Sequence, residues 1–261
     1  MAPFHQAVKV DFLRKEGDID IYGGVVDGEW CVGVVPNGGF VLGLVVEACI
    51  KRQVRTNHPD PVHVTAHFLR ATAALAPFEV HIHQLKTGRG FTNLIADLIK
   101  NVCILYSALF LKIQLTSLFF WQGVVKITTH QYFGDLTTDS TKNASPFHLT
   151  LAPPSPYARR LPLHQHPSKA PLRTLHEAFK YSKFFKASSE PEIAARNAPD
   201  STIRSGSETI GGNGIEWGQW ATLTDDGDTL TRPLIAFMVD MITPPATLLP
   251  KSEKPNMPDA R

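Results

Sequence analysis

The sequence has few cysteines and no obvious targeting segment. Its three cysteines, Cys31, Cys49 and Cys103, stand far apart without the spacing of a metal site, and an odd number of them fits a reducing compartment. Residues 1–14 carry no apolar stretch behind a basic start, and the ending Pro-Asp-Ala-Arg is neither a peroxisomal nor an endoplasmic-reticulum signal. These absences favour a cytoplasmic protein.

Basic runs and the common nucleotide motifs are absent as well. The formal net charge is +2 without a cluster of lysine and arginine, which argues against a nucleic-acid-binding protein. Residues 211–214 lack the Gly-Lys-Ser/Thr ending of a phosphate loop, and no Gly-x-Ser-x-Gly indicates an α/β-hydrolase. Three histidine pairs lack a cysteine or carboxylate cluster that would complete a metal site: His63 with His67, His81 with His83, and His164 with His166. We predict neither a metal nor a cofactor.

The sequence does contain one strongly apolar helix. Residues Gly39–Val54 are apolar around most of the helix circumference, which is typical of a buried helix. Asn37 is the predicted N-cap. Basic residues complement the helix dipole at the other end: Lys51, Arg52 and Arg55.

Strand patterns lie on both sides of this helix. Before it, Ile19–Trp30 is predicted to be extended, and turns are expected there at Gly23-Gly24 and Asp27-Gly28. After it, four runs have strand character: Val62–Arg70, Pro77–Leu85, Phe91–Ile99 and Val124–Phe133. The second of these alternates, with three apolar side chains on one face: Phe78, Val80 and Ile82. One buried helix among antiparallel strands predicts a sheet that curls around the helix.

The second half repeats part of this order. A proline-rich stretch, Leu151–Leu175, is followed by a predicted strand at Ile215–Leu223 and a second apolar helix at Leu230–Ile242. Glycine, tryptophan, turn and apolar helix therefore occur twice, as a weak internal repeat. No strand pattern follows Ile242 to cover the second helix. We expect that a partner covers it or that the chain has lost its end.

The segment Val102–Gln122 interrupts the strands with a long apolar run. A transmembrane span of about twenty residues is one interpretation, although Lys112 and Gln114 lie at its middle, where a lysine costs roughly 3 kcal/mol. A buried extra helix is another. We favour a third interpretation, translated intron sequence, because the codons at its two ends can match splice sites. Deleting it joins Asn101 to Gly123, and Asn-Gly between two strands is the strongest short hairpin signal.

The order of several motifs resembles a known family. They are PNGGFVLGLVVEA at the helix start, PDPVHVTAHFLRAT and FEVHIHQLKTGRGFTNLIADLI in the strands after it, GVVKITTHQYFGDL beyond the apolar run, and GIEWGQWATL with PLIAFMVDMITPP in the second half. This order resembles the thioesterase-like superfamily, specifically double hot-dog acyl-CoA thioesterases of the acyl-CoA thioesterase II type. It implies an α+β double hot-dog fold, in which an antiparallel sheet curls around a central apolar helix twice, with the second hot dog incomplete.

The resemblance also implies a domain order. The N-terminal hot dog would cover residues 18–136, including the insert 102–122. A linker would cover 137–206, a partial C-terminal hot dog 207–249, and a disordered tail 250–261.

The implied reaction is hydrolysis of acyl-CoA by water, which yields a free fatty acid and CoA without a serine nucleophile. In the family, an aspartate on the second hot-dog helix activates the water, and a threonine and a glutamine later in the chain assist it. Asp240 falls on the aspartate position, whereas the strands for its two partners are not found, so the catalytic set is predicted to be incomplete. The helix-start residues Asn37, Gly38 and Gly39 are expected to bind the substrate, where backbone N–H groups stabilise the oxyanion. Arg89 is expected to meet a phosphate or carboxylate of the substrate.

Other interpretations remain open. Gly38 and Gly39 could serve only a tight turn, and Asp240 could face solvent. Glu47 on the first helix is a second candidate for the carboxylate, since some single hot-dog thioesterases place one there, but it is expected to face solvent. The main alternative function is a catalytically inactive hot-dog protein that binds acyl groups or pairs with another subunit. A protein attached to a membrane by residues 102–121 is a third. Hot dogs commonly pair edge to edge, so a homo-oligomer is expected.

Overall fold

The computed structural model describes residues 2–103, 121–136, 166–198, 201–202, 217–225 and 229–241. Contacts divide the chain into two units. The first comprises residues 1–136, 177–184 and 225–241, and the second comprises residues 137–176, 185–224 and 242–261. Most of the apolar run, residues 104–120, lies outside the described residues. Its three interpretations therefore stay predictions.

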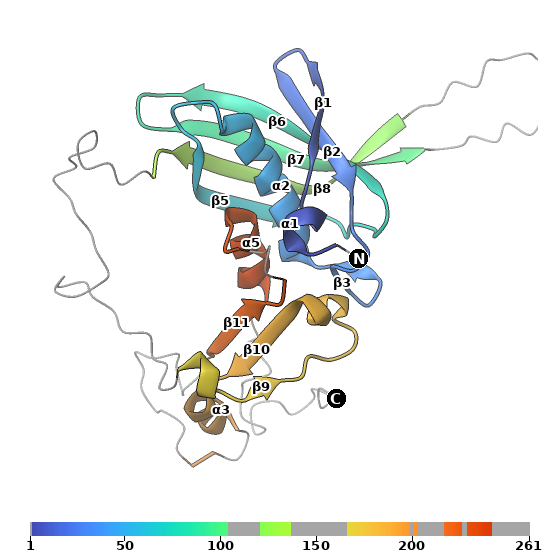
Figure 1. Ribbon diagram of the computed structural model, residues 1–261. Helices are drawn as coiled ribbons and strands as arrows, with labels where there is room; N and C mark the ends of the chain where they lie inside the picture. Colours follow the sequence, from blue (N-terminus) through green and yellow to red (C-terminus); the bar gives the residue numbers. More distant parts are fainter. Residues whose placement is uncertain are drawn as a thin grey trace, which may run out of the picture. The chain divides into compact units, whose positions relative to one another are not determined.

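A six-stranded antiparallel sheet forms the main part of the first unit (Figure 1). Its strand order is β1-β2-β6-β7-β8-β5. The strands are β1 (Asp11–Glu16), β2 (Ile19–Val25), β5 (Asp60–Phe68), β6 (Pro77–Thr87), β7 (Thr92–Cys103) and β8 (Trp121–Gly134). A short hairpin of β3 (Cys31–Val32) and β4 (Val35–Pro36) leads into the first long helix. All four strands predicted after that helix are present, with ends shifted by a few residues.

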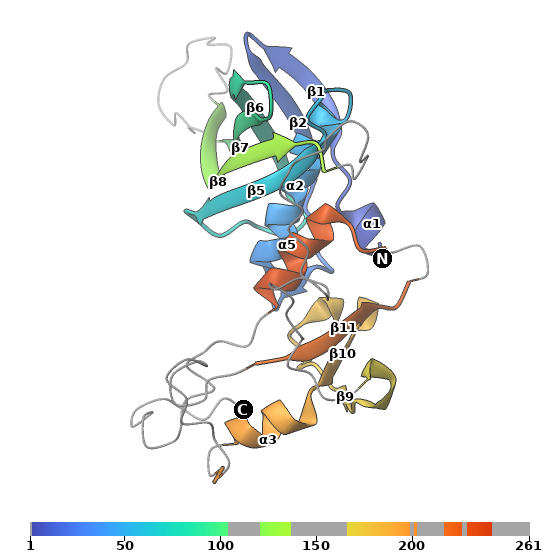
Figure 2. The same ribbon diagram turned by 90° about the vertical axis from the view of Figure 1, so that its left-hand side faces the viewer.

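Helix α2 (Gly38–Gln53) lies on one face of this sheet, which curves around it (Figure 2). Its side chains are buried on most sides, as the apolar pattern predicts. The alternating apolar residues of β6, Phe78, Val80 and Ile82, are at most 3% exposed. A sheet curled around a buried apolar helix confirms the α+β hot-dog architecture.

A cluster of aromatic rings closes the end of the first unit at which α2 begins. Trp30 is fully buried, and its ring centroid lies within 5.5 Å of those of Phe4, Phe40, Phe184 and Phe237. We call these five residues the Trp30 cluster. Two of its members come from short helices, α1 (Phe4–Ala7) and the 3-10 helix η2 (Lys180–Phe184). The cluster thus joins segments that are far apart in the sequence.

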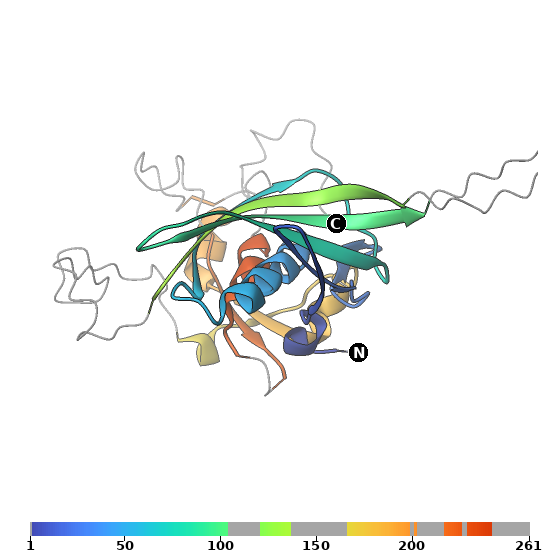
Figure 3. The ribbon, with the colours of Figure 1, turned by 90° about the horizontal axis from the view of Figure 1, so that it is seen from above.

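Helix α5 (Arg232–Asp240) packs antiparallel against α2, on the same side of the sheet (Figure 3). Gly39 in the first turn of α2 lies against Ala236, whereas Gly43, one turn later, lies against Pro233 near the start of α5. The backbones touch at these glycines, because a Cβ atom on Gly39 would lie only 2.5 Å from the carbonyl oxygen of Ala236. The second predicted apolar helix is therefore present and belongs to the first unit.

The second unit contains a three-stranded antiparallel sheet in the order β11-β10-β9. Its described elements are the 3-10 helix η1 (Pro167–Lys169), β9 (Leu172–Arg173), β10 (Phe185–Ser189), α3 (Pro191–Asn197) and β11 (Gln219–Leu223). Strand β11 matches the end of the predicted strand Ile215–Leu223. The described part of the range 137–206, expected to be a linker, thus holds regular elements that the sequence analysis did not predict.

The glycine pair Gly23-Gly24 does not form the expected turn. Both residues lie inside β2 and pair with Glu79 and Phe78 of β6. Gly23 also packs under β1, where a Cβ atom would lie 2.6 Å from the side chain of Leu13. The missing side chain therefore allows close packing within the sheet rather than a change of direction. Strand β1 itself was not predicted, because all six of its residues are exposed and carry no alternating pattern.

Candidate functional site

Asp240, the last residue of α5, meets the first turn of α2. Its Oδ2 atom accepts a hydrogen bond from the backbone N–H of Gly39 at 2.9 Å. The first N–H groups of a helix have no partner within the helix and carry partial positive charge, so a carboxylate is favourable there. Asp240 lies at the exposed end of α5. The structure thus brings together two residues that the sequence analysis proposed.

Asn37 is the N-cap of α2, as predicted. Its Oδ1 atom accepts the N–H of Phe40 at 2.8 Å. Its side chain also makes a hydrogen bond with Tyr181, which is fully buried in η2. Burial, and then the negative charge of Asp240, raise the pKa of Tyr181. Tyr181 therefore remains a neutral hydroxyl beside the helix start. The sequence analysis missed it because no local pattern links η2 to α2.

Gly38 lies between the carboxylate of Asp240 and the ring of Phe68 at the end of β5. A Cβ atom at Gly38 would lie 3.3 Å from Asp240 Oδ2 and 3.3 Å from Phe68 Cε1. Asp240 and Asn37 occupy the N–H groups of the next two residues of α2. The N–H of Gly38 has no acceptor among the described residues. It is therefore the helix-start donor best placed to bind an external oxygen.

One pocket is lined by Gly38 itself, and another is lined by residues of α5 that precede Asp240. The first, which we call the Gly38 pocket, has a volume of about 420 Å³ and is lined by Gly38, Phe68 and Arg70 among others. The second, the Val239 pocket, has a volume of about 300 Å³ and is lined mainly by apolar side chains of α2, β5 and α5, including Ala236 and Val239. A group bound at Gly38 therefore has the Gly38 pocket beside it, and the Val239 pocket begins at the residue before Asp240.

Arg89 lies at the opposite end of α2. It is exposed in the turn between β6 and β7, and its carbonyl oxygen forms a hydrogen bond with the ring of His58 at 3.3 Å. The carbonyl of His58 in turn accepts from the side chain of Gln53, the last residue of α2. Because a helix of this length spans about 24 Å, the fold does not bring Arg89 to Asp240.

Glu47 is half-buried on α2 rather than facing solvent as expected. Burial raises the pKa of its carboxyl group, and the charge of Lys51 opposes this effect. Two of the histidines from the pairs have other hydrogen-bond partners: His63 has Thr65, and His81 has Glu79. In the described part of the chain, no group of three or more His, Cys, Asp or Glu residues could hold a metal ion.

No helix among the residues that the structure describes has the length and apolarity needed to cross a membrane.

Comparisons with known proteins agree with this architecture. Residues 26–111 match the acyl-CoA thioesterase N-terminal domain family. A 77-residue stretch is 34% identical to the ustilagic acid biosynthesis cluster protein orf2 of Mycosarcoma maydis; this match spans 28% of the chain and only 19% of that protein.

Solved structures share the fold across most of the chain. A candidate thioesterase II from Thermobifida fusca YX superposes with a TM-score of 0.63 at 17% identity, covering 95% of this chain and 74% of that one. An acyl-CoA thioesterase II, TesB2, from Mycobacterium marinum gives a TM-score of 0.53 at 14% identity, covering 91% and 68%. A conserved hot-dog protein from Alicyclobacillus acidocaldarius gives 0.59 at 15% identity, covering 94% and 71%. The chain therefore shares the fold of these structures, and its residues 26–111 resemble an acyl-CoA thioesterase N-terminal domain.

Proposed function

We propose that this protein hydrolyses acyl-CoA thioesters at the meeting point of Asp240 and Gly38. The observation that supports the proposal best is the position of Asp240, because its carboxylate lies beside the open helix-start N–H of Gly38, which lines a pocket. This arrangement occurs in a chain whose residues 26–111 match an acyl-CoA thioesterase domain.

The reaction follows from the two groups. Asp240 orients a water molecule and takes a proton from it as the water oxygen attacks the thioester carbon. The N–H of Gly38 and the positive end of α2 stabilise the oxyanion of the tetrahedral intermediate. The carbon–sulfur bond then breaks, CoA leaves as a thiolate that takes up a proton, and the fatty acid is released. No covalent intermediate on the protein is needed.

One observation favours the second candidate, an acyl-binding protein without catalysis. The Oδ2 atom of Asp240 already accepts the N–H of Gly39, and a carboxylate at a helix start can serve only to stabilise that helix end. In that case the two pockets would hold an acyl thioester without attack by water.

Release of free thiol from acyl-CoA, followed with a thiol-reactive dye, separates the two candidates. Asp240→Asn keeps the shape and the Gly39 contact but cannot take a proton, so we expect kcat to fall by about a hundredfold or more. Asp18→Asn, in the exposed turn between β1 and β2, is the matched control and should keep the full rate. A rate that survives Asp240→Asn would place the base elsewhere. Absence of thiol release by the unmodified protein would favour acyl binding.

A further inference from the structure

We propose that Arg70 binds the phosphate groups of coenzyme A at the mouth of the Gly38 pocket, while the acyl chain occupies the Val239 pocket. This inference rests on the proposed function and assigns each part of the substrate to a place in the fold. Arg70 thus takes the substrate-binding role that the sequence predicted for Arg89, which lies at the far end of α2.

The lining of the Gly38 pocket is the first argument. Arg70 is its one charged residue; apart from Thr72, the other lining residues are glycine or apolar. Arg70 lies in the loop that follows β5 and is exposed. A cation at the rim of a mostly apolar pocket suits a ligand with an uncharged arm and an anionic end.

Arg70 is also available for an external anion. Arg14, Arg52 and Arg232 each pair with a carboxylate of this chain. For Arg70, no carboxylate of the described residues lies within ion-pair distance. An unpaired guanidinium presents its N–H donors in a fork whose geometry matches a phosphate group.

The backbone holds Arg70 in place before a ligand arrives. The N–H groups of Arg70 and Leu69 both donate to the carbonyl of Lys126 in β8, at 3.2 and 2.9 Å. The start of α2 at Gly38 adds partial positive charge to the same pocket. Because the backbone of the loop is already held by β8, binding of the diphosphate end of the substrate has to order only the Arg70 side chain.

The Val239 pocket suits the other end of the substrate. Leu42, Val46 and Ile235 contribute apolar surface to it, as does Val239, which directly precedes Asp240. An acyl chain is stabilised by leaving water for such a surface. A thioester carbonyl held at the Gly38 N–H can therefore direct its two ends into different pockets.

The test compares Arg70→Ala with Arg55→Ala in the full-length chain. Arg55 is exposed just beyond the C-terminal end of α2 and serves as a matched loss of charge away from both pockets. The substrates are an acyl-CoA and the same acyl group on pantetheine, which carries the thioester without phosphates. For Arg70→Ala we expect KM for acyl-CoA to rise about tenfold. We expect kcat, and KM for acyl-pantetheine, to stay unchanged, and Arg70→Lys to recover part of the loss.

Three kinetic results would overturn the proposal. One is an unchanged KM of Arg70→Ala for acyl-CoA. Another is an equal rise of KM for acyl-pantetheine, since Arg70 would then contact the acyl group or the pantetheine arm. The third is a loss shared by Arg55→Ala, which would show a general effect of charge.

If neither substrate is hydrolysed, the proposed function fails but the role of Arg70 is still decided. Binding of CoA alone is then measured by isothermal titration calorimetry. Weaker CoA binding by Arg70→Ala, with Arg55→Ala unchanged, supports the assignment. Absent binding, or equal affinities of all three proteins, contradicts it.

Discussion

Gly39, a single residue of the predicted helix-start motif, serves the packing of two helices rather than the expected access of a substrate. The sequence predicted that the glycine pair, Gly38 and Gly39, lets a substrate approach the backbone N–H groups. In the structure, the space beside Gly39 is filled by α5, since a Cβ atom there would lie 2.5 Å from Ala236 O and 2.6 Å from Asp240 Cβ. Gly39 thus permits the helix contact that places Asp240, and Gly38 is the residue that faces a pocket.

Gly39→Ala should therefore destabilise the protein. The added methyl group collides with the backbone of α5, and overpacking of this kind costs about 1–3 kcal/mol. Gly90→Ala in the β6–β7 turn is the control, because nothing lies within 4 Å of a Cβ atom there, and its effect should stay within about 0.5 kcal/mol. Chemical denaturation measures both. Similar stabilities of the two variants would show that α5 does not pack against Gly39.

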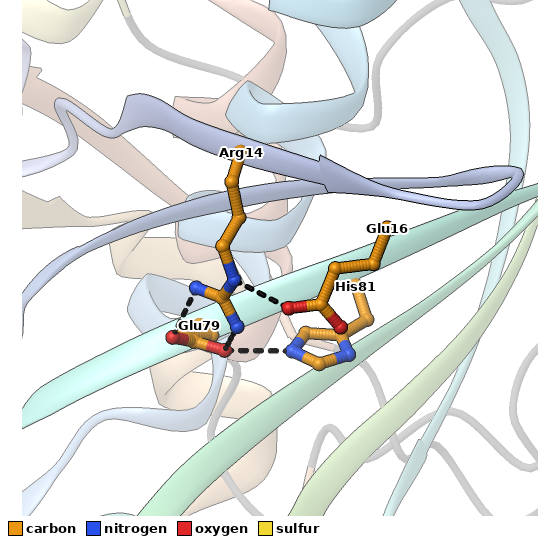
Figure 4. A network of polar contacts seen from close by, with 4 residues as sticks. All are labelled: Arg14, Glu16, Glu79 and His81. Carbon is orange, nitrogen blue, oxygen red and sulfur yellow. Dashed lines mark hydrogen bonds and ion pairs between the residues drawn. The ribbon is translucent and has the colours of Figure 1, made fainter.

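Glu79 is the centre of a charged network on strands β1 and β6 (Figure 4). Arg14 donates to both of its carboxylate oxygens, at 2.8 and 3.0 Å, and also to Glu16 at 2.6 Å. His81 forms a further hydrogen bond with Glu79 at 2.8 Å. The contact with Arg14, above all, lowers the pKa of Glu79 from 4.5 to about 2. The network joins β1, an exposed strand, to the rest of the sheet.

The lowered pKa predicts how stability depends on pH. Because the folded protein binds the Glu79 proton more weakly than the unfolded chain, this group's contribution is present in full above pH 4.5 and is lost as the pH falls towards 2. Glu79→Gln should remove that part of the acid loss. At neutral pH it should cost about 1 kcal/mol or less, since the Arg14 side chain is 42% exposed. Urea unfolding between pH 2 and 7 measures this, with the exposed Glu177→Gln as control. If the free energy of unfolding depends on pH in the same way in both variants, Glu79 does not have the lowered pKa.

At the scale of elements, the pairing of β7 with β8 bears on the apolar run between them. Lys100 pairs with Val124 and Asn101 with Gly123, the two residues that the proposed deletion would join, and the ladder continues for two more pairs, to Cys103 and Trp121. A two-residue turn needs its flanking residues to be partners. The register of Lys100 and Val124 already meets that requirement.

Deleting residues 102–122 should consequently remove only the last two pairs of the β7–β8 ladder and leave the rest of the sheet intact. Asn101 and Gly123 would form a two-residue turn in the register that β7 and β8 already have. We expect the far-ultraviolet circular dichroism spectrum of the deletion variant to keep the β-sheet signal of the full-length chain. We also expect its thermal unfolding to remain cooperative, with a midpoint at the same or a higher temperature. As control, deleting Lys100 together with these residues shifts the register by one and should destabilise the sheet. Loss of cooperative unfolding in the first deletion would show that the segment is needed for folding.

At the scale of the molecule, the edge of the main sheet predicts self-association. Strand β5 is one edge of the six-stranded sheet, and its Val62 is 46% exposed. An uncovered apolar edge is a template for pairing with another chain. We expect a concentration-dependent dimer in sedimentation velocity that Val62→Lys weakens. Val34→Lys, at the 82% exposed turn between β3 and β4, should leave it unchanged. A monomer at all concentrations would refute this prediction.

Local patterns predicted much of the first unit. Helix α2, its cap at Asn37 and the alternation of β6 depend on neighbours within a few residues, so periodicity and capping chemistry sufficed. The candidate site could be predicted from the sequence only in part. Asp240 and Gly38 came from a family resemblance, whereas Tyr181 and Arg70 have no motif, because their importance depends on residues distant in the chain.

The sequence by itself determined the buried helix, the strands that cover it and the glycines at its start, since burial and alternation leave a periodic trace. Only the tertiary structure decided that α5 lies along α2, that Asp240 takes the N–H of Gly39, and that Arg70 rather than Arg89 borders the Gly38 pocket. These contacts are formed by helix packing and strand order across long stretches of chain, and no local pattern encodes which distant residue will meet which.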